Sequence, residues 1–285
     1  MWLLVLALLA QVPIADSLPP TGAPPTVSHP VVYELARPPA PTVKARSAYL
    51  LDVDTGEVLY QIDAHGRHAP ASLTKVVTAL VALDLTRLDQ VITVPASINQ
   101  IPWDSTRMGL RAGERVTVRE LLYGLFLNSG NDAAVTLADS VIPRTAFIAR
   151  MNAKAAAIGM TETHFVNPIG LDDPAHFTSA ADLARAAIEL RNRFPEVAAM
   201  ATVQRLTLPA TPAHHAYNLY NLNDLIRTYP GASGLKTGWT GQAGGCLIAT
   251  ASRDGRQLLV VVMGSPKVFQ EAATLLDYGF DSPAA

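Results

Sequence analysis

Ser72 and Lys75 are a serine and a lysine three residues apart, a spacing that could support nucleophilic catalysis. An apolar-periodic run from Val76 to Leu83 follows them and predicts a helix, and Pro70 stands just upstream, where helices commonly begin. Ser72 is therefore expected at the helix N-terminus and Lys75 about one turn inside, on the same face. A serine hydroxyl attacks well only when a base takes its proton, and the lysine amine would fill that role. By itself, however, this spacing is more typical of a capped helix with a surface lysine.

A second polar group, Ser129-Gly130-Asn131, falls where one predicted helix ends and the next begins. Such a junction exposes polar side chains that a helix interior would not. Ser129 could relay a proton there, and Asn131 could donate hydrogen bonds to an amide substrate and accept them from it. On its own the triplet is also typical of a helix cap followed by a turn.

A third group, Lys236-Thr237-Gly238 with Trp239 after it, leads into the C-terminal strands. A strand edge that carries a glycine lets a substrate backbone lie alongside it. Lys236 would supply a point charge for a carboxylate, and Thr237 would supply a hydroxyl. A surface turn with a basic residue is the alternative interpretation of this stretch.

The composition of the 285 residues excludes several classes of function. The net charge is −2 and no basic patch with interleaved aromatic residues occurs, so nucleic acid is not an expected partner. The single cysteine, Cys246, excludes an internal disulfide and a cysteine-based zinc site, and we expect it to be a small buried hydrophobic residue. The seven histidines show no metal-binding spacing, and His214-His215 is typical of a loop, so we predict neither a metal nor another cofactor.

Three segments are expected along the chain. Residues 1–17 contain an almost wholly apolar stretch, too short to span a bilayer, that suits a secretory signal peptide although the usual positive residues are missing. Residues 18–43 contain eight prolines and predict an extended, semi-rigid tether, and residues 44–285 predict a single folded domain. We expect export to the periplasm or the cell-envelope exterior, with cleavage near Ala15 or retention of the N-terminus as a membrane tether. A buried N-terminal strand is the alternative for the apolar stretch.

Two predicted hairpins lie at the two ends of the folded domain. Residues 48–53 and 57–60 flank one short glycine-containing loop, and residues 247–251 and 257–263 flank another. A closing helix is expected at 272–278. Strands at both ends of a mostly helical chain are typical of the α+β class, and we expect the first and last strands to share one sheet.

Four further helices are expected between the Ser72 helix and the second hairpin. A capping box at Thr117 and Glu120 opens the first, and the second runs to Pro143. The third covers residues 144–158, and another capping box, from Ser179 to Asp182, opens the fourth. These helices would form a second lobe, and a site is expected in the groove between the lobes.

In this order, the groups S-x-x-K, S-x-N and K-T-G are the signature shared by penicillin-binding proteins and serine β-lactamases. From about residue 45 to residue 280 the chain resembles D-alanyl-D-alanine carboxypeptidases of the low-molecular-mass penicillin-binding type. The stretches 129–133 (SGNDA), 165–171 (FVNPIGL) and 275–280 (LLDYGF) add to the resemblance. It implies a β-lactamase- and transpeptidase-like fold, in which an antiparallel sheet flanked by helices meets a mostly helical lobe at the active-site groove.

The resemblance also implies a reaction. Ser72 attacks the carbonyl between the two terminal D-alanines of a peptidoglycan stem peptide, and Lys75 takes its proton. Ser129 passes a proton to the leaving amine, Asn131 orients the substrate amide, and water releases the acyl-enzyme. The lysine pKa, ordinarily about 10.4, would have to fall by roughly 3 units for this role, and burial and the charge of Lys236 both act in that direction.

The same resemblance assigns the substrate-binding groups. Lys236, Thr237 and Gly238 receive the terminal carboxylate, and the backbone N–H groups of Ser72 and Trp239 hold the oxyanion. β-Lactams are expected to act as covalent inhibitors.

The sequence departs from the family pattern near its C-terminal end. Gln270 precedes Glu271-Ala272 where many members carry an arginine that assists carboxylate binding, so we expect weaker carboxylate recognition. Many members continue into a β-rich second domain and an amphipathic anchor, whereas this sequence ends at Ala285, just after the closing helix. We therefore expect neither element here and any membrane attachment through the N-terminus.

Several alternatives stay open. A class A β-lactamase uses a Glu-x-x-x-Asn pattern between the second and third motifs, but Glu162, Glu189 and Glu196 have no asparagine four residues on, and its middle motif is typically Ser-Asp-Asn. A non-catalytic peptidoglycan-binding module would keep the fold without being acylated. Carboxypeptidase, endopeptidase and transpeptidase activities share the same motif residues, so the sequence does not separate them.

Overall fold

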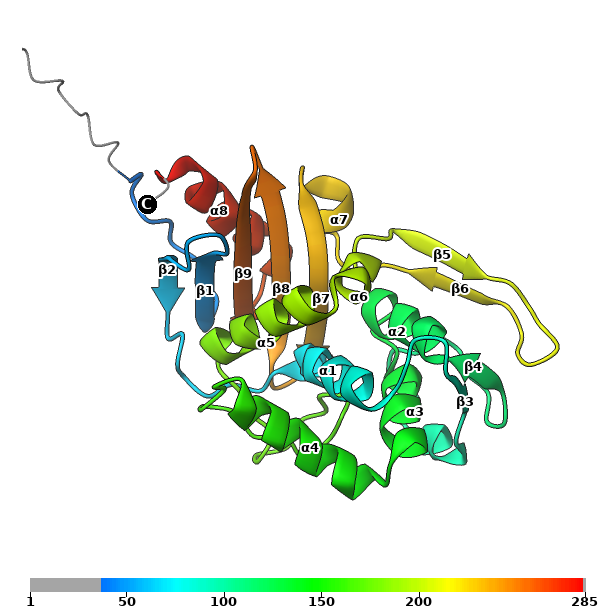
Figure 1. The fold of residues 1–285 in the computed structure, drawn as a ribbon. Coiled ribbons are helices and arrows are strands. Elements are labelled where there is room, and N and C mark those ends of the chain that lie inside the picture. The colour runs from blue at the N-terminus through cyan, green and yellow to red at the C-terminus, as the bar shows by residue number, and fades with distance from the viewer. Residues whose placement is uncertain (1–36, 284–285) are drawn as a thin grey trace, which may run out of the picture. The chain divides into compact units, whose positions relative to one another are not determined.

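The computed structural model describes residues 37–283, and a five-stranded antiparallel sheet lies at their centre (Figure 1). The strand order is β2-β1-β9-β8-β7, so the first hairpin pairs directly with the last: Ser47 lies opposite Met263 and Asp52 opposite Leu258. The predicted α+β class, with the first and last strands in one sheet, is confirmed. The strands of this sheet are β1 (Ser47–Asp52), β2 (Val58–Ile62), β7 (Ala232–Thr240), β8 (Gly244–Arg253) and β9 (Arg256–Ser265).

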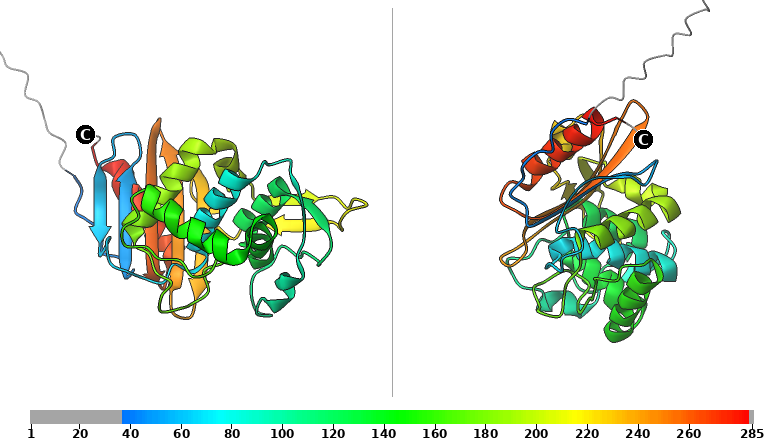
Figure 2. Two further views of the ribbon diagram at one scale, coloured as in Figure 1. Left: turned by 60° about the horizontal axis from the view of Figure 1, so that its bottom comes forward. Right: turned by 90° about the vertical axis from the view of Figure 1, so that its left-hand side faces the viewer.

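Both faces of the sheet are covered, because alternate residues of β9 enter different hydrophobic clusters. Leu259 and Val261 pack with the helical lobe, whereas Leu258 and Val260 pack with α8 (Val268–Asp281). Figure 2 shows α8 on one face of the sheet and the helical lobe on the other. A strand that is buried on both faces reads as a continuous apolar run, which is why residues 257–263 were recognisable as a strand without polar alternation.

The helical lobe surrounds α1 (Lys75–Leu85), whose residues from Lys75 to Leu83 are all buried. A helix that is apolar on every side belongs in a core, and α1 packs against three other helices of the lobe. Lys75 therefore enters an apolar environment at the first residue of this helix. The other helices are η1 (Ala71–Thr74), η2 (Ala96–Gln100), α2 (Val118–Leu127), α3 (Asn131–Val141), α4 (Arg144–Ala157), α5 (Ala180–Arg193), α6 (Pro195–Met200) and α7 (Leu225–Thr228).

Two small antiparallel strand pairs were not predicted. Strand β3 (Val91–Thr93) pairs with β4 (Arg115–Thr117), and β5 (Arg205–Leu208) pairs with β6 (Tyr217–Tyr220). Strands of three or four residues are too short to show a hydrophobic period, so the sequence gives little signal for them.

The helix starts agree with prediction at one capping box and differ at the other. Thr117 Oγ1 accepts from Glu120 N at 3.2 Å, and Glu120 Oε2 accepts from Thr117 N at 2.7 Å, so the first box is confirmed. At the second, Ser179 Oγ accepts from Asp182 N, but the predicted reciprocal bond is absent. The Asp182 carboxylate instead accepts from Thr163 Oγ1 and Glu162 N, both at 2.8 Å, and from Arg185 on its own helix, and these partners compete with the predicted local one. The second capping box was therefore a wrong prediction.

Residues 1–36, which include the predicted signal peptide at 1–17 and most of the predicted tether at 18–43, lie outside the described part of the chain. Residues 37–43 form neither helix nor strand, and Pro41 O accepts a hydrogen bond from Tyr60 Oη at 3.0 Å. Within residues 37–283, no helix combines the length and the apolar character that crossing a bilayer requires.

Candidate active site

Ser72 and Lys75 are in direct contact, with Lys75 Nζ 2.6 Å from Ser72 Oγ. The local structure differs from the prediction, because Ser72 belongs to the 3-10 turn η1 and Lys75 is the first residue of α1. Side chains three residues apart eclipse each other in a 3-10 helix, so the tighter turn brings the amine directly to the hydroxyl. Lys75 is fully buried, whereas Ser72 is only partly buried, so the pair meets the solvent from the serine side.

A turn from Asn167 to Leu171 closes the site behind Lys75. Lys75 Nζ also donates to Ile169 O at 2.8 Å. Asn167 Oδ1 holds the turn by accepting from the N–H groups of the residues at 169, 170 and 171, at 3.2, 2.7 and 3.2 Å. In the sequence this stretch is recognisable only through the family resemblance. Its Asn-Pro dipeptide is a turn signal that could have predicted the turn, although not its contact with Lys75.

Ser129 and Lys236 form a second serine–lysine pair. Lys236 Nζ donates to Ser129 Oγ at 2.8 Å and to Thr237 O at 2.7 Å. Ser129 lies between α2 and α3, as predicted, with a positive φ of 54°. Lys236, like Lys75, is fully buried. Two distant segments of the sequence therefore meet through one hydrogen bond.

Asn131 and Asp132 are the first two residues of α3. Asn131 lines the cavity, whereas Asp132 binds the backbone of a neighbouring loop. Asn131 is 5% exposed, and its Oδ1 lacks a hydrogen-bond partner among residues 37–283, which leaves an acceptor for a substrate N–H. The Asp132 carboxylate is fully buried and accepts from the N–H groups of Met108, Gly109 and Leu110 at 2.8, 2.9 and 2.9 Å. It thereby holds the loop that precedes β4. This role of Asp132 was not predicted, because its contacts span more than 20 residues.

Strand β7 approaches the nucleophile closely, and Gly238 is what permits this. A Cβ at position 238 would lie 2.9 Å from Ser72 N, so any side chain there would push β7 away from η1. The predicted strand context of Lys236-Thr237-Gly238 is confirmed. Trp239 follows with its side chain 72% exposed.

The three groups meet at one cavity of about 630 Å³. Lys75 and Lys236 lie behind its wall, each hydrogen-bonded to a serine that faces the cavity. Two carboxylates, from Asp104 and Asp172, also line it. The motif residues that contribute to its wall are Ser72, Ser129, Asn131, Thr237, Gly238 and Trp239.

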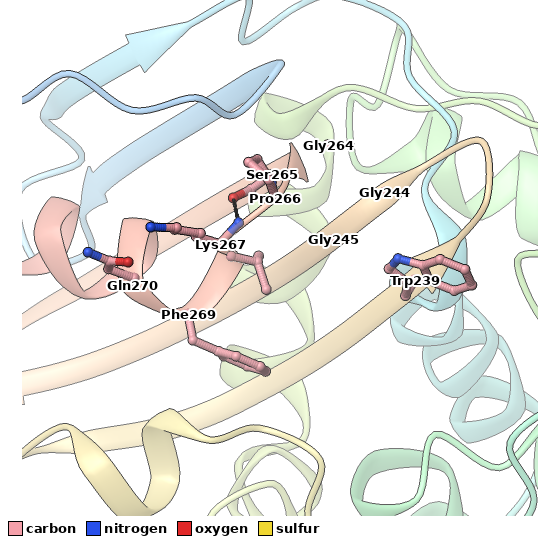
Figure 3. A pocket seen from close by; sticks show the side chains of 10 residues that line it. Trp239, Gly244, Gly245, Gly264, Ser265, Pro266, Lys267, Phe269 and Gln270 are labelled. Carbon is pink, nitrogen blue, oxygen red and sulfur yellow. Dashed lines mark hydrogen bonds between the residues drawn. The ribbon is translucent and has the colours of Figure 1, made fainter.

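A second cavity of about 640 Å³ adjoins the first and shares Trp239 and Phe269 with it. Figure 3 shows Lys267 and Gln270 on the α8 side of this cavity, across from Trp239. Gln270 thus stands near the site as a neutral residue, and Lys267 is the cation of this cavity wall. The two cavities together leave space beyond the end of β7.

Burial dominates the electrostatics of the two lysines. Burial lowers the pKa of Lys75 well below its ordinary value, the charge of Lys236 lowers it further, and Asp132 opposes both effects. Burial also lowers the pKa of Lys236 to about 7. An unprotonated Lys75 amine beside a hydroxyl is a general base in position to act. The direction of the shift, and both of its causes, are those that the sequence predicted.

Cys246, His214 and His215, which the sequence also singled out, lie outside the cavity of about 630 Å³ or only at its wall. Within residues 37–283, no group of three or more His, Cys, Asp or Glu is arranged to hold a metal ion. Cys246 is buried, as predicted, and burial raises the pKa of its thiol to about 11. His214 and His215 lie in the connection between β5 and β6, where the His215 ring contacts Glu114.

The known proteins that this chain resembles in sequence are D-alanyl-D-alanine carboxypeptidases. Residues 34–267 match the family model for D-alanyl-D-alanine carboxypeptidase. The D-alanyl-D-alanine carboxypeptidase DacB2 of Mycobacterium tuberculosis is 38% identical over 254 residues, which cover 85% of this chain and 84% of the relative. The D-alanyl-D-alanine carboxypeptidase DacF of Bacillus subtilis is 36% identical over 244 residues, but the match spans only 62% of its length.

Solved structures share the fold over most of their length. The Streptomyces K15 DD-transpeptidase superposes with a TM-score of 0.78 at 32% identity, covering 84% of this chain and 98% of that one. A penicillin-binding protein homologue of Mycobacterium tuberculosis superposes with a TM-score of 0.80 at 35% identity, covering 88% of this chain and 97% of that one. The predicted β-lactamase- and transpeptidase-like architecture is therefore confirmed.

The turn behind Lys75 gives a stability prediction. Gly170 has φ +86°, and a Cβ there would lie 1.8 Å from Ala71 O, whereas Gly113 has φ +89° and nothing within 4 Å. Gly113→Ala should cost about 1 kcal/mol of unfolding free energy for its backbone conformation alone, and Gly170→Ala about 3 kcal/mol because the chain must also move. Urea denaturation of both variants measures the difference. Equal losses would contradict tight packing of this turn against the backbone beside Ser72.

Proposed function

The chain belongs to the D-alanyl-D-alanine carboxypeptidase family, and from this premise we propose that Ser72 is its acylated nucleophile. The enzyme is a serine-type D-Ala-D-Ala carboxypeptidase, a hydrolase that removes the terminal D-alanine from peptidoglycan stem peptides. The observation that supports the role of Ser72 is its 2.6 Å contact with Lys75 Nζ at the wall of the cavity of about 630 Å³. A neutral, buried amine beside a hydroxyl is the arrangement that general-base activation requires.

In the first step, Ser72 Oγ forms a bond to the carbonyl carbon between the two D-alanines, and its proton moves to Lys75 Nζ. Burial lowers the pKa of Lys75 and so favours its neutral form beforehand, and the ammonium formed keeps Ile169 O as an acceptor at 2.8 Å. The backbone N–H groups of Ser72 and Trp239 stabilise the tetrahedral oxyanion. One such donor typically contributes about 100- to 1000-fold to the rate.

Breakdown of the tetrahedral intermediate requires a proton at the nitrogen of the leaving D-alanine. Ser129 Oγ already accepts from Lys236 Nζ, so its own hydroxyl hydrogen is free for another acceptor. Ser129 donates that hydrogen to the leaving amine, and the proton taken up by Lys75 replaces the one lost. Water then attacks the acyl-enzyme with Lys75 again as base, which releases the shortened peptide and restores Ser72.

The substrate backbone lies along the free edge of β7, the last strand of the sheet. Asn131 Oδ1 accepts from a substrate amide, which supplies the partner that it otherwise lacks. Lys236 and Thr237 receive the terminal carboxylate beside Gly238, and that negative charge favours the protonated form of Lys236. Gln270 adds no charge to this recognition, so the family's usual arginine contribution is missing.

The physiological partner is a peptidoglycan stem peptide. β-Lactams offer Ser72 a reactive amide carbonyl in place of the scissile one, and we expect them to form a covalent adduct there. We also propose that the protein is exported and that residues 1–17 tether it to the membrane. Those residues lie outside the described part of the chain.

A DD-endopeptidase is the second candidate, and the adjoining cavity of about 640 Å³ is the observation that favours it. A cross-linked substrate presents the same D-alanyl carbonyl, but its leaving amine belongs to a second stem peptide. Space beyond Trp239 gives such a larger leaving group room that a single D-alanine does not need.

Incubation with a stem pentapeptide and with a cross-linked dimer tests the nucleophile and the substrate together. We expect the wild-type protein to release D-alanine from the pentapeptide and Ser72→Ala to release none, because the attacking hydroxyl is gone. Mass spectrometry of the products measures both reactions. Unchanged release by a folded Ser72→Ala variant would refute the assigned nucleophile, and dimer cleavage without D-alanine release would favour the endopeptidase.

The pH dependence of acylation reports on the buried base. Because only neutral Lys75 can take the Ser72 proton, the rate of acylation by labelled penicillin should rise with pH as Lys75 loses its proton. Replacing Lys236 by methionine removes the neighbouring positive charge that lowers the Lys75 pKa, so this rise should move to higher pH in Lys236→Met.

The matched control for this profile is Lys267→Met, which removes an exposed lysine of the second cavity. Its profile should coincide with that of the wild-type protein. The midpoint of the rise, rather than the maximal rate, is the informative quantity, since Lys236→Met also loses a substrate contact. An unmoved midpoint in Lys236→Met would contradict the electrostatic coupling of the two lysines.

A further inference from the structure

The residue before Ser72 has an unusual backbone conformation. Ala71 has φ +49°, and among the non-glycine residues of 37–283 only Asp63, Ser129 and Asp254 also have a positive φ. Polar side chains can stabilise this left-handed conformation through bonds to the nearby backbone, but an alanine side chain cannot. The surroundings must therefore hold Ala71 in place.

One of these surroundings is the hydroxyl of Thr74. Thr74 Oγ1 donates to Ala71 O at 2.9 Å, and Thr74 is fully buried. The same hydroxyl lies 2.9 Å from His176 Nε2, on a segment 102 residues further along the chain. A hydroxyl that donates one hydrogen bond and accepts another forms the middle of a chain of three groups.

The direction of this chain follows from the other nitrogen of the imidazole. Val166 N donates to His176 Nδ1 at 3.0 Å, so Nδ1 is the acceptor and Nε2 carries the hydrogen. Nε2 therefore donates to Thr74 Oγ1, which donates to Ala71 O. His176 is 2% exposed, and burial lowers its pKa to about 4, so the ring stays neutral near pH 7.

Ala71 O and the Ser72 N–H belong to one planar peptide group. Its C=O and N–H point in opposite directions, so a bond that fixes Ala71 O also fixes the direction of the Ser72 N–H. Among the hydrogen bonds of residues 37–283, none uses the Ser72 N–H as donor. Gly238 approaches this nitrogen without a side chain, and Gly170 packs closely against Ala71 O. The N–H is thus both oriented and free.

We propose that Thr74 and His176 are positioning residues that aim the Ser72 N–H at the substrate oxyanion, through the chain from imidazole to hydroxyl to Ala71 carbonyl. This inference rests on the proposed acyl transfer at Ser72 and deepens it. Each hydrogen bond polarises the next in a buried network, so the N–H at its end is a stronger donor to a negative oxygen. Neither side chain lines the cavity, and both act through the backbone of the nucleophile.

Matched threonine variants separate positioning from simple support of the fold. Thr74→Val keeps the branched shape without the hydroxyl, whereas Thr74→Ser keeps the hydroxyl. Thr178→Val is the control, because Thr178 is also fully buried and its Oγ1 contacts Thr163 Oγ1 at 2.7 Å instead of the Ala71 carbonyl. His176→Leu removes the donor at the start of the chain, and His176→Gln retains a donor and an acceptor.

The readouts are the acylation rate with labelled penicillin and the kcat and KM of D-alanine release. In Thr74→Val, acylation and kcat should fall about 10- to 100-fold with KM changed less than about threefold, because a misdirected oxyanion donor weakens mainly the transition state. Thr74→Ser should stay within about threefold of wild type, since it keeps the donor. His176→Leu should behave like Thr74→Val, and His176→Gln should regain most of the lost rate.

Melting temperatures of the same variants complete the test. Thr178→Val should lose thermal stability as Thr74→Val does and yet keep wild-type acylation and kcat. A Thr74→Val variant that is acylated at the wild-type rate, or a Thr178→Val variant that loses as much rate, would overturn the positioning role. A wild-type protein inactive with both penicillin and pentapeptide would overturn the proposed function itself, which is a distinguishable result.

Discussion

The burial of two lysine amines beside one cavity is the constraint on which this site depends. Removing an ammonium group from water is costly, so a fully buried lysine gives up its proton more readily, and the charge of Lys236 adds to that tendency at Lys75. Each amine meets a serine hydroxyl, at 2.6 Å for Ser72 and 2.8 Å for Ser129. In the proposed mechanism this burial makes Lys75 the base that activates Ser72, while Lys236 is the cation that receives the substrate carboxylate.

The fold supplies this burial through elements far apart in the sequence. Helix α1 is apolar on every side and therefore places Lys75 in the core, while β7 brings Lys236 in along the edge of the sheet. The Asn167 side chain shapes the turn that gives Lys75 its second hydrogen-bond acceptor, Ile169 O. Pairing of β1 with β9 joins the two ends of the domain, so the C-terminal strands lie in a fixed position against the early helix.

The parts of this structure that sequence could predict are those with a local signal. The S-x-x-K, S-x-N and K-T-G spacings, the hairpins and the Thr117 capping box are each complete within a few residues. The 3-10 turn at Ser72 had no such signal, because it shares its residue preferences with an α-helix start. The Thr74–His176 contact and the partners of Asp132 join segments that are distant in sequence, so no pattern in one chain reveals them. The capping box that was wrongly predicted at Ser179 shows the same limit. Glu162 N and Thr163 Oγ1, which are distant in sequence, donate to the Asp182 carboxylate in place of the Ser179 backbone.

An NMR titration of Lys75 in the intact protein tests the central claim most directly. The sequence contains five lysines, so ¹³C labelling at Cε gives few resonances, and the Lys75 signal is identified by its loss in Lys75→Arg. Because Lys75 is buried beside Lys236, this signal should titrate well below the ordinary lysine pKa of about 10.4. A Lys75 amine that titrates at the ordinary value would contradict the account, because it would be protonated near neutral pH and unable to accept the Ser72 proton.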